Sequence, residues 1–178
     1  ALTPPVRATE QVHLALGRSP YEMNVQYSDA SGSGTVRFGT DLTNLEFSVP
    51  TETHTFTDGG DEKYTQTHHV ATMTNLKPSQ TYFYTVGSDS SGWSPTFDFK
   101  TAPDETTLEF PLRFGIWGDM GFANSQILKA VVDEVENKNF DMILHVGDFA
   151  YDFNSNNGHN GDDFMKAIQP LAAHVPYM

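Results

Sequence analysis

The sequence predicts an all-β sandwich followed by the start of an α/β domain with a parallel sheet. Up to about residue 101, apolar and polar residues alternate with a period of two, which is typical of half-buried strands. The segment TAPDETTLEFP (101–111), with two prolines and three acidic residues, then interrupts the pattern. Beyond it, two short apolar runs flank a stretch with helical spacing, as in a strand–helix–strand unit.

These changes of pattern divide the chain into three segments. We expect residues 1–101 to form the sandwich, residues 102–111 to form a linker, and residues 112–178 to form the N-terminal part of a second domain. A length of 178 residues is sufficient for two small domains or for one large domain.

Alternating apolar side chains mark the strands of the first part. They are separated by turn-forming segments such as SDASGSG (28–34) and TDGGDE (57–62), as in an antiparallel sandwich. The alternating sets are Val12, Leu14 and Leu16; Met23, Val25 and Tyr27; Val36 and Phe38; Leu45, Phe47 and Val49; Tyr82, Tyr84 and Val86; and Phe97 and Phe99.

The segment LKPSQTYFYTV (76–86) predicts a corner of the sandwich. Leu76, Pro78 and Tyr82 have the spacing of a tyrosine corner, in which the tyrosine hydroxyl bonds to upstream backbone. With these residues the first part resembles a fibronectin type III domain. His68 and His69 lie in the strand before the corner. Because neighbours on a strand point to opposite faces, we do not expect this pair to bind one metal together.

The second part has the pattern of one βαβ unit. LRFGIWGD (112–119) and FDMILHVGD (140–148) are short apolar strands, and their near-continuous apolar character indicates burial on both faces. NSQILKAVVDEVEN (124–137) has helical spacing, with Asn124 or Ser125 as the N-cap. VPYM (175–178) is expected to form a further strand.

Two acidic residues end the two predicted parallel strands. Gly-Asp pairs are common in turns, and this is the simplest reading of Asp119 or Asp148 alone. Taken together, both would lie at the carboxyl edge of the sheet, where open α/β sheets bind ligands. Neighbouring strands are roughly 4.8 Å apart, so the two carboxylates would repel unless a cation lay between them. The pattern therefore favours a metal site, and a metal pair roughly 3.5–4 Å apart fits the gap.

Tyr151 follows the second acidic residue by three positions. A phenol, whose ordinary pKa is about 10, becomes a phenolate ligand only beside a strongly acidic metal, and hard, oxygen-seeking ferric iron is the natural candidate. The alternative is that Tyr151 only packs against the loop.

The motifs GDMG (118–121) and GDFAY (147–151) resemble the first two motif blocks of the purple acid phosphatases, in particular the animal enzymes of the two-domain type. These are binuclear metallophosphoesterases with a fibronectin-like domain before the catalytic one. The resemblance extends over the whole chain, to GDDFMKAIQPLAAHVPYM (161–178). It implies that residues 112–178 begin a metallophosphoesterase domain.

The resemblance also implies a ligand set and a reaction. Asp119 would bind Fe(III), Asp148 would bridge Fe(III) and a second divalent metal (Zn, Mn or Fe), and Tyr151 would bind iron as phenolate. Phosphate monoesters would be hydrolysed at acid pH with metal-bound hydroxide as the nucleophile. The family further implies a secreted or lysosomal location and leaves a homodimer open.

The later motif blocks of the family are absent from this sequence. Only three of the family's usual seven metal ligands occur, so no catalytic set is complete here. His145, His159 and His174 do not fall in a family block, and we place His159 in the Asn- and Gly-rich loop NSNNGHNG (154–161). We expect these residues to be the N-terminal portion of a larger enzyme, inactive alone, with an open sheet edge and an exposed apolar face that the missing C-terminal part of the catalytic domain would complete.

Composition excludes several classes of partner. The formal net charge of −13 argues against nucleic-acid or anionic-membrane binding, which need a basic face. No apolar run approaches the roughly 18 residues of a membrane span. The sequence has no cysteine, which excludes disulfides and thiolate sites. Two alternatives to an acid phosphatase stay open, namely another metallophosphoesterase such as a phosphodiesterase, and a non-catalytic sandwich binding protein.

Overall fold

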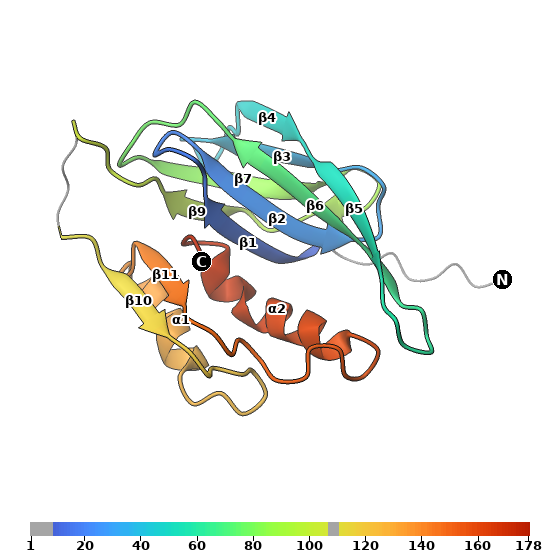
Figure 1. The fold of residues 1–178 in the computed structure, drawn as a ribbon. Helices are drawn as coiled ribbons and strands as arrows, with labels where there is room; N and C mark the ends of the chain where they lie inside the picture. Colours follow the sequence, from blue (N-terminus) through green and yellow to red (C-terminus); the bar gives the residue numbers. More distant parts are fainter. Residues whose placement is uncertain (1–8, 107–110) are drawn as a thin grey trace.

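Residues 9–106 and 111–178 are described by a computed structural model, in which a β-sandwich is joined to a small α/β unit (Figure 1). One sheet of the sandwich has the strand order β1-β2-β6-β5, and the other has the order β4-β3-β7-β8 with β9 also paired to β7. The first sheet consists of β1 (Glu10–Leu16), β2 (Met23–Asp29), β6 (Thr65–Met73) and β5 (Glu52–Thr57). The second consists of β4 (Phe47–Pro50), β3 (Thr35–Gly39), β7 (Thr81–Ser88), β8 (Gly92–Trp93) and β9 (Phe97–Lys100).

Most of the alternating residues form the sandwich core as predicted, and the exceptions are Leu16, Leu45, Phe47 and Val49. The buried core includes Val12, Leu14, Met23, Val25, Tyr27, Val36, Phe38, Tyr82, Tyr84, Val86, Phe97 and Phe99. The strand expected over 45–49 begins only at Phe47, whose side chain is exposed, because β4 lies at the edge of its sheet. Leu16 is only partly buried, since it ends β1.

The predicted corner is confirmed. The backbone N–H of Lys77 donates a hydrogen bond to the hydroxyl of buried Tyr82, at 3.0 Å. The two neighbouring histidines have separate partners, as expected from their opposite directions. His69 is fully buried with Nε2 2.8 Å from Oδ1 of Asp29, whereas His68 Nδ1 lies 2.8 Å from the Ser28 hydroxyl.

The βαβ unit is also confirmed, with a shorter helix than predicted. It consists of β10 (Phe114–Trp117), α1 (Leu128–Glu136) and β11 (Met142–His145), and the two strands pair in parallel from Phe114–Met142 to Trp117–His145. Helix α1 begins at Leu128 rather than near residue 124, and its N-cap is Ile127 without a side-chain cap. Ser125 still contributes at this end, because its hydroxyl accepts a hydrogen bond from the Leu128 N–H.

Burial on both faces of these strands, which the sequence suggested, is wrong for this part of the chain. Ile143 is fully buried on one face, whereas Phe114, Ile116 and Val146 are 43%, 61% and 66% exposed. These three side chains form an exposed apolar sheet face, as the sequence predicted.

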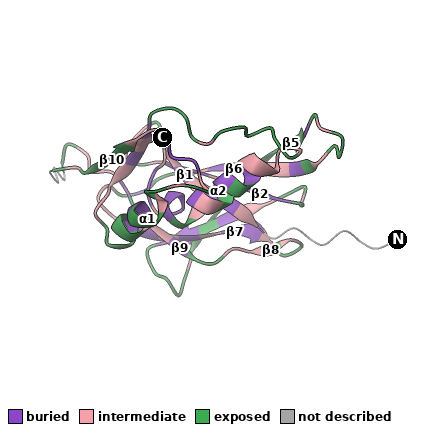
Figure 2. Ribbon diagram, turned by 90° about the horizontal axis from the view of Figure 1, so that it is seen from below, coloured by how far each residue is buried: buried purple, intermediate pink, exposed green. Residues whose placement is uncertain are grey.

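The helix α2 (His159–Ala172) was not predicted. It lies along β1 of the sandwich and beside the βαβ unit (Figure 1). Buried residues concentrate on α2 and the neighbouring strands in Figure 2, and Phe164, Ile168 and Leu171 form the buried row of this helix. The predicted strand over 175–178 is reduced to two isolated parallel bridges, Pro176 with Leu14 and Tyr177 with Ile143. None of the helices in the described ranges is long and apolar enough to cross a membrane.

Direct hydrogen bonds join the two parts. The hydroxyl of buried Tyr84 donates to the carbonyl oxygen of Ala173 at 2.7 Å, and Ala173 belongs to the core of the sandwich. The Val12 N–H donates to the Gln169 side chain at 2.9 Å. Gln169 and Ala173 therefore bond to strands of both sheets of the sandwich, β1 and β7.

Asp98 on β9 is an ionic link between the two parts, and we expect it to make stability pH-dependent. Its carboxylate lies 3.0 Å from His174 Nδ1 and 2.6 Å from Lys138 Nζ. The hydrogen bond from His174 and the charge of Lys138 lower the pKa of Asp98 to about 2 from its ordinary 3.8. Because the folded-state pKa is depressed, the stabilisation is fully present above about pH 4 and is lost as the pH falls toward 2.

The free energy of unfolding of the variant Asp98→Asn should therefore be about 1–2 kcal/mol lower than that of the wild type at pH 5–6. At pH 2 the two free energies should be almost equal. Urea unfolding across this range measures the effect. Asp61→Asn, at an exposed acidic position of the sandwich, is the matched control. An equal loss at both pH values would contradict an ionic role for Asp98.

Candidate metal centre

Asp119 and Asp148 lie at matching ends of the two parallel strands. Backbone hydrogen bonds hold the two loops side by side after the strands end, from Val146 N to Trp117 O at 2.8 Å and from Gly121 N to Phe149 O at 3.0 Å. Both aspartates adopt the left-handed backbone conformation, with φ of 53° and 47°. This conformation is uncommon outside glycine, and its cost of order 1 kcal/mol per residue is met by the surrounding loop contacts.

Tyr151 joins this pair. Its hydroxyl donates a hydrogen bond to Oδ1 of Asp119. The ring is 57% exposed, so packing against the loop, the alternative reading of this residue, does not account for its position. The hydrogen bond to Asp119, followed by partial desolvation and the charges of Asp119 and Asp148, raises the pKa of Tyr151 to about 12. Asp148 follows the neighbouring parallel strand, and the loops after the two strands are bonded to each other, so the three predicted residues lie at one edge of the sheet.

The donor set fits a hard, highly charged cation. It has two carboxylates and one phenol, all oxygen donors, which suit ferric iron far better than a soft metal. The Tyr151 hydroxyl now donates its proton in a hydrogen bond to Asp119. A cation of this kind would replace that proton, and the phenol would then bind as phenolate. Within residues 9–106 and 111–178 no three His, Cys, Asp or Glu side chains form a metal site by themselves. A metal ion bound at this edge would therefore need Tyr151 and ligands beyond these three residues.

Aromatic packing fixes the loop that carries Tyr151. Phe149 and Phe153, two positions before and after it, both contact the buried ring of Phe164 on α2, with centroid distances of 6.3 and 5.4 Å. Phe164 was missed because α2 was not predicted. The signal was present, since Phe164, Ile168 and Leu171 have the i, i+4, i+7 spacing of a buried helix face.

Within the described residues, none of the three histidines of the second part is hydrogen-bonded to the side chains of Asp119, Asp148 or Tyr151. His145 is buried in an aromatic cluster, its Nδ1 hydrogen-bonded to the hydroxyl of Tyr177, and burial lowers its pKa. His159 begins α2 rather than lying in a loop, and contacts Glu62 of the sandwich. His174 bonds to Asp98.

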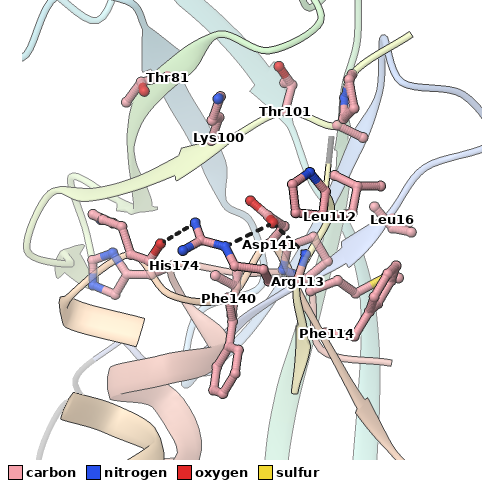
Figure 3. A pocket seen from close by; sticks show the side chains of 17 residues that line it. Leu16, Thr81, Lys100, Thr101, Leu112, Arg113, Phe114, Phe140, Asp141 and His174 are labelled. Atoms are coloured by element: carbon pink, nitrogen blue, oxygen red, sulfur yellow. Dashed lines mark hydrogen bonds and ion pairs between the residues drawn. The ribbon is translucent and has the colours of Figure 1, made fainter. Parts of the chain in front are cut away.

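A cavity lies away from the candidate metal centre. Its volume is about 680 Å³, and it lies between the sandwich and the βαβ unit. Figure 3 shows residues that line it, among them Leu16, Arg113 and Phe140. It lies at the amino ends of β10 and β11, opposite the edge that carries the aspartates. Arg113 is engaged within it, since its guanidinium donates to the carbonyl oxygen of Lys138 at 2.8 Å and pairs with Asp141. This cavity is therefore separate from the candidate metal centre.

Comparison with known proteins identifies relatives along the whole chain. The family model for the "Purple acid Phosphatase, N-terminal domain" matches residues 9–101, just over half of the chain. "Acid phosphatase type 7" of Mus musculus is 36% identical over 171 residues, and that of Danio rerio is 38% identical over 173 residues; each alignment covers 95% of this chain and 38% of the relative. The solved structure of purple acid phosphatase PPD1 from yellow lupin matches with a TM-score of 0.76 at 25% identity, over 97% of this chain and 34% of that one.

Proposed function

The chain belongs to the purple acid phosphatase family, and from this premise we propose that it is the N-terminal part of an acid phosphatase that hydrolyses phosphate monoesters. The chain spans 38% of the length of the acid phosphatases it matches, so the activity belongs to the longer polypeptide. The observation that carries the proposal is the contact of Tyr151 with Asp119 at one edge of the parallel sheet, with Asp148 at the end of the neighbouring strand.

In this proposal the three oxygen donors hold two metal ions. Asp119 and Tyr151 would bind Fe(III), and Asp148 would bind both Fe(III) and a divalent ion, namely Zn, Mn or Fe. Such a pair, when bound, would activate water at acid pH and neutralise charge on the phosphoryl group. The parallel strands and the backbone bonds between the loops hold the backbones of Asp119 and Asp148 side by side, which supports this arrangement. Further ligands and a general acid would come from the remainder of the polypeptide.

The rest of the assignment stays a prediction. We retain the division into a sandwich over 1–101, a linker over 102–111 and a catalytic portion over 112–178; residues 1–8 and 107–110 of these segments lie outside the described residues. The exposed apolar face of β10 and β11 would receive the C-terminal part of the catalytic domain. A secreted or lysosomal location and a homodimer rest on the family alone.

A pair of chromogenic substrates tests the reaction class. We expect the complete polypeptide to hydrolyse p-nitrophenyl phosphate at acid pH at least about 100-fold faster than bis(p-nitrophenyl) phosphate, and residues 1–178 alone to hydrolyse neither. Removal of the metals by a chelator should abolish turnover. Preference for the diester would instead indicate a phosphodiesterase. Turnover by residues 1–178 that disappears in Asp148→Asn would contradict the incompleteness of the site.

A further inference from the structure

Side chains of types that can bind metal ions line a pocket on the sandwich, under helix α2. A pocket of about 290 Å³ opens there, lined by His13 of β1, His68 of β6 and Met165 of α2, together with Gln11 and Ser28. It is separate from the edge of the parallel sheet that carries Asp119, Asp148 and Tyr151. The sequence did not single out His13 or Met165.

The hydrogen bond of His13 fixes its tautomer. Its Nδ1 lies 2.8 Å from the backbone carbonyl oxygen of Gln11. Because a carbonyl can only accept, Nδ1 carries the proton, and in the neutral ring Nε2 keeps its lone pair. A histidine that gives its Nδ1 proton to a carbonyl is arranged as metal-binding histidines usually are.

A chain of hydrogen bonds fixes the tautomer of His68 in the same way. The carboxylate of Asp162 accepts from Gln11 Nε2 at 3.1 Å, so the amide oxygen of Gln11 is left to accept from the Ser28 hydroxyl at 3.3 Å. The hydroxyl proton of Ser28 is thus committed to Gln11. His68 Nδ1, 2.8 Å from the Ser28 oxygen, must donate, and the Nε2 lone pair of His68 is free.

Burial favours the neutral, ligating form of both rings. Burial lowers the pKa of His13, and burial also lowers that of His68, although the charge of Asp162 acts in the opposite direction. No residue in the described ranges forms a hydrogen bond to either Nε2. The same nearby carboxylate of Asp162 would favour a cation in the pocket.

The third donor comes from α2. Asp162, Met165 and Gln169 have the i, i+3, i+7 spacing of one helix face. The first and last of them bond to the sandwich, since Asp162 accepts from the Gln11 side chain and the Gln169 side chain accepts from the Val12 N–H. Met165, between them, therefore faces the strands, and its side chain lines the pocket with the two imidazoles.

We propose that His13, His68 and Met165 form a second metal site, selective for a borderline-to-soft d-block ion, with Cu(I) as the best match and Zn(II) as the alternative occupant. Two imidazole nitrogens and a thioether are soft donors compared with the oxygen set at the sheet edge, and thioether ligands select Cu(I). Within the described ranges no third His, Cys, Asp or Glu side chain completes this pair, so the third protein ligand is Met165. The ion would tie α2 to β1 and β6.

Competition titration of the purified protein tests the site. Cu(I) is added anaerobically against a chromogenic Cu(I) chelator, and Zn(II) is added in a separate calorimetric titration. We expect one equivalent of Cu(I) to bind, and His13→Gln or His68→Gln to weaken it by at least about 100-fold. Met165→Leu should weaken Cu(I) by at least about 10-fold and Zn(II) by less than about 3-fold, because only Cu(I) prefers the thioether.

Matched controls separate this site from the others. Asp148→Asn should leave the Cu(I) stoichiometry unchanged, and so should His54→Gln, which replaces an exposed histidine paired with His68 across the strands but outside the pocket. Nitrogen-15 NMR of the wild type needs no variant, and addition of metal should shift Nε2 of His13 and His68 only. The proposal is overturned if those resonances do not move, or if His54→Gln weakens binding as much as His68→Gln.

Discussion

Replacing Asp148 with asparagine in the complete enzyme is expected to lower kcat for a phosphate monoester by at least about 1000-fold while leaving the fold intact. Asparagine has nearly the same shape and tolerates the left-handed backbone conformation of this position, where φ is 47°. Asparagine lacks the negative charge that would hold both metal ions. We therefore expect the loss in kcat to arise in the hydrolysis step, which needs the two ions at a fixed separation.

Asp152→Asn is the matched control for this variant. Asp152 lies in the same loop, is exposed and has a φ of 57°, so the exchange makes the same chemical change four positions away. We expect its kcat to stay within about 2-fold of wild type, because surface substitutions away from a site have small effects. Comparable losses in the two variants would show that the loop, rather than the Asp148 carboxylate, supports the activity.

Replacing Phe164 with alanine is expected to lower the free energy of unfolding by about 3–5 kcal/mol. The Phe164 ring is 1% exposed and contacts His145, Phe149 and Phe153, so its removal leaves a cavity between α2 and the loop of Tyr151. The loop should loosen together with the core, and the metal centre should weaken as a consequence. Urea unfolding, monitored by circular dichroism, measures the change.

Phe47→Ala provides the control for aromatic truncation. The Phe47 side chain is 48% exposed at the edge of the sandwich. It contacts the buried ring of Phe38 but is not itself part of the buried core. We expect this substitution to lower the free energy of unfolding by less than about 1.5 kcal/mol, because about half of the Phe47 side chain is already in water. If Phe164→Ala cost no more than Phe47→Ala, α2 would not form part of the cooperative core.

The sequence predicted the elements whose periodicity is strong. The sandwich core followed from the alternation of residues such as Val12, Leu14 and Tyr84, and these are buried. Strand β5 (Glu52–Thr57) was not identified, because all six of its residues are exposed and no apolar alternation marks it. Helix α2 was missed because Gly161 and Pro170, both poor helix formers, interrupt its pattern.

The sequence pattern predicted only the part of the candidate site that lies at the ends of the strands. Asp119 and Asp148 end two strands that pair in parallel, so their common edge followed from the βαβ pattern. The contact of Tyr151 with Asp119 occurs in a loop without periodicity, and the resemblance to a family pointed to it instead. The bond from Tyr84 to Ala173 joins residues 89 positions apart, and no local pattern indicates it.

The visible absorption spectrum of Tyr151→Phe tests the central claim most directly, because it reports on the metal ligand without using catalysis. Asp119 accepts the hydrogen bond of the Tyr151 hydroxyl and raises the pKa of the phenol to about 12, so only a bound cation would make it a phenolate near neutral pH. In the complete, iron-loaded enzyme we predict that Tyr151→Phe abolishes the tyrosine-to-iron charge-transfer band with the circular dichroism spectrum unchanged. Tyr21→Phe, which removes an exposed hydroxyl bonded to Asp104, should leave the band intact. An unchanged band in Tyr151→Phe would contradict ligation by this tyrosine, and with it the metal centre proposed here.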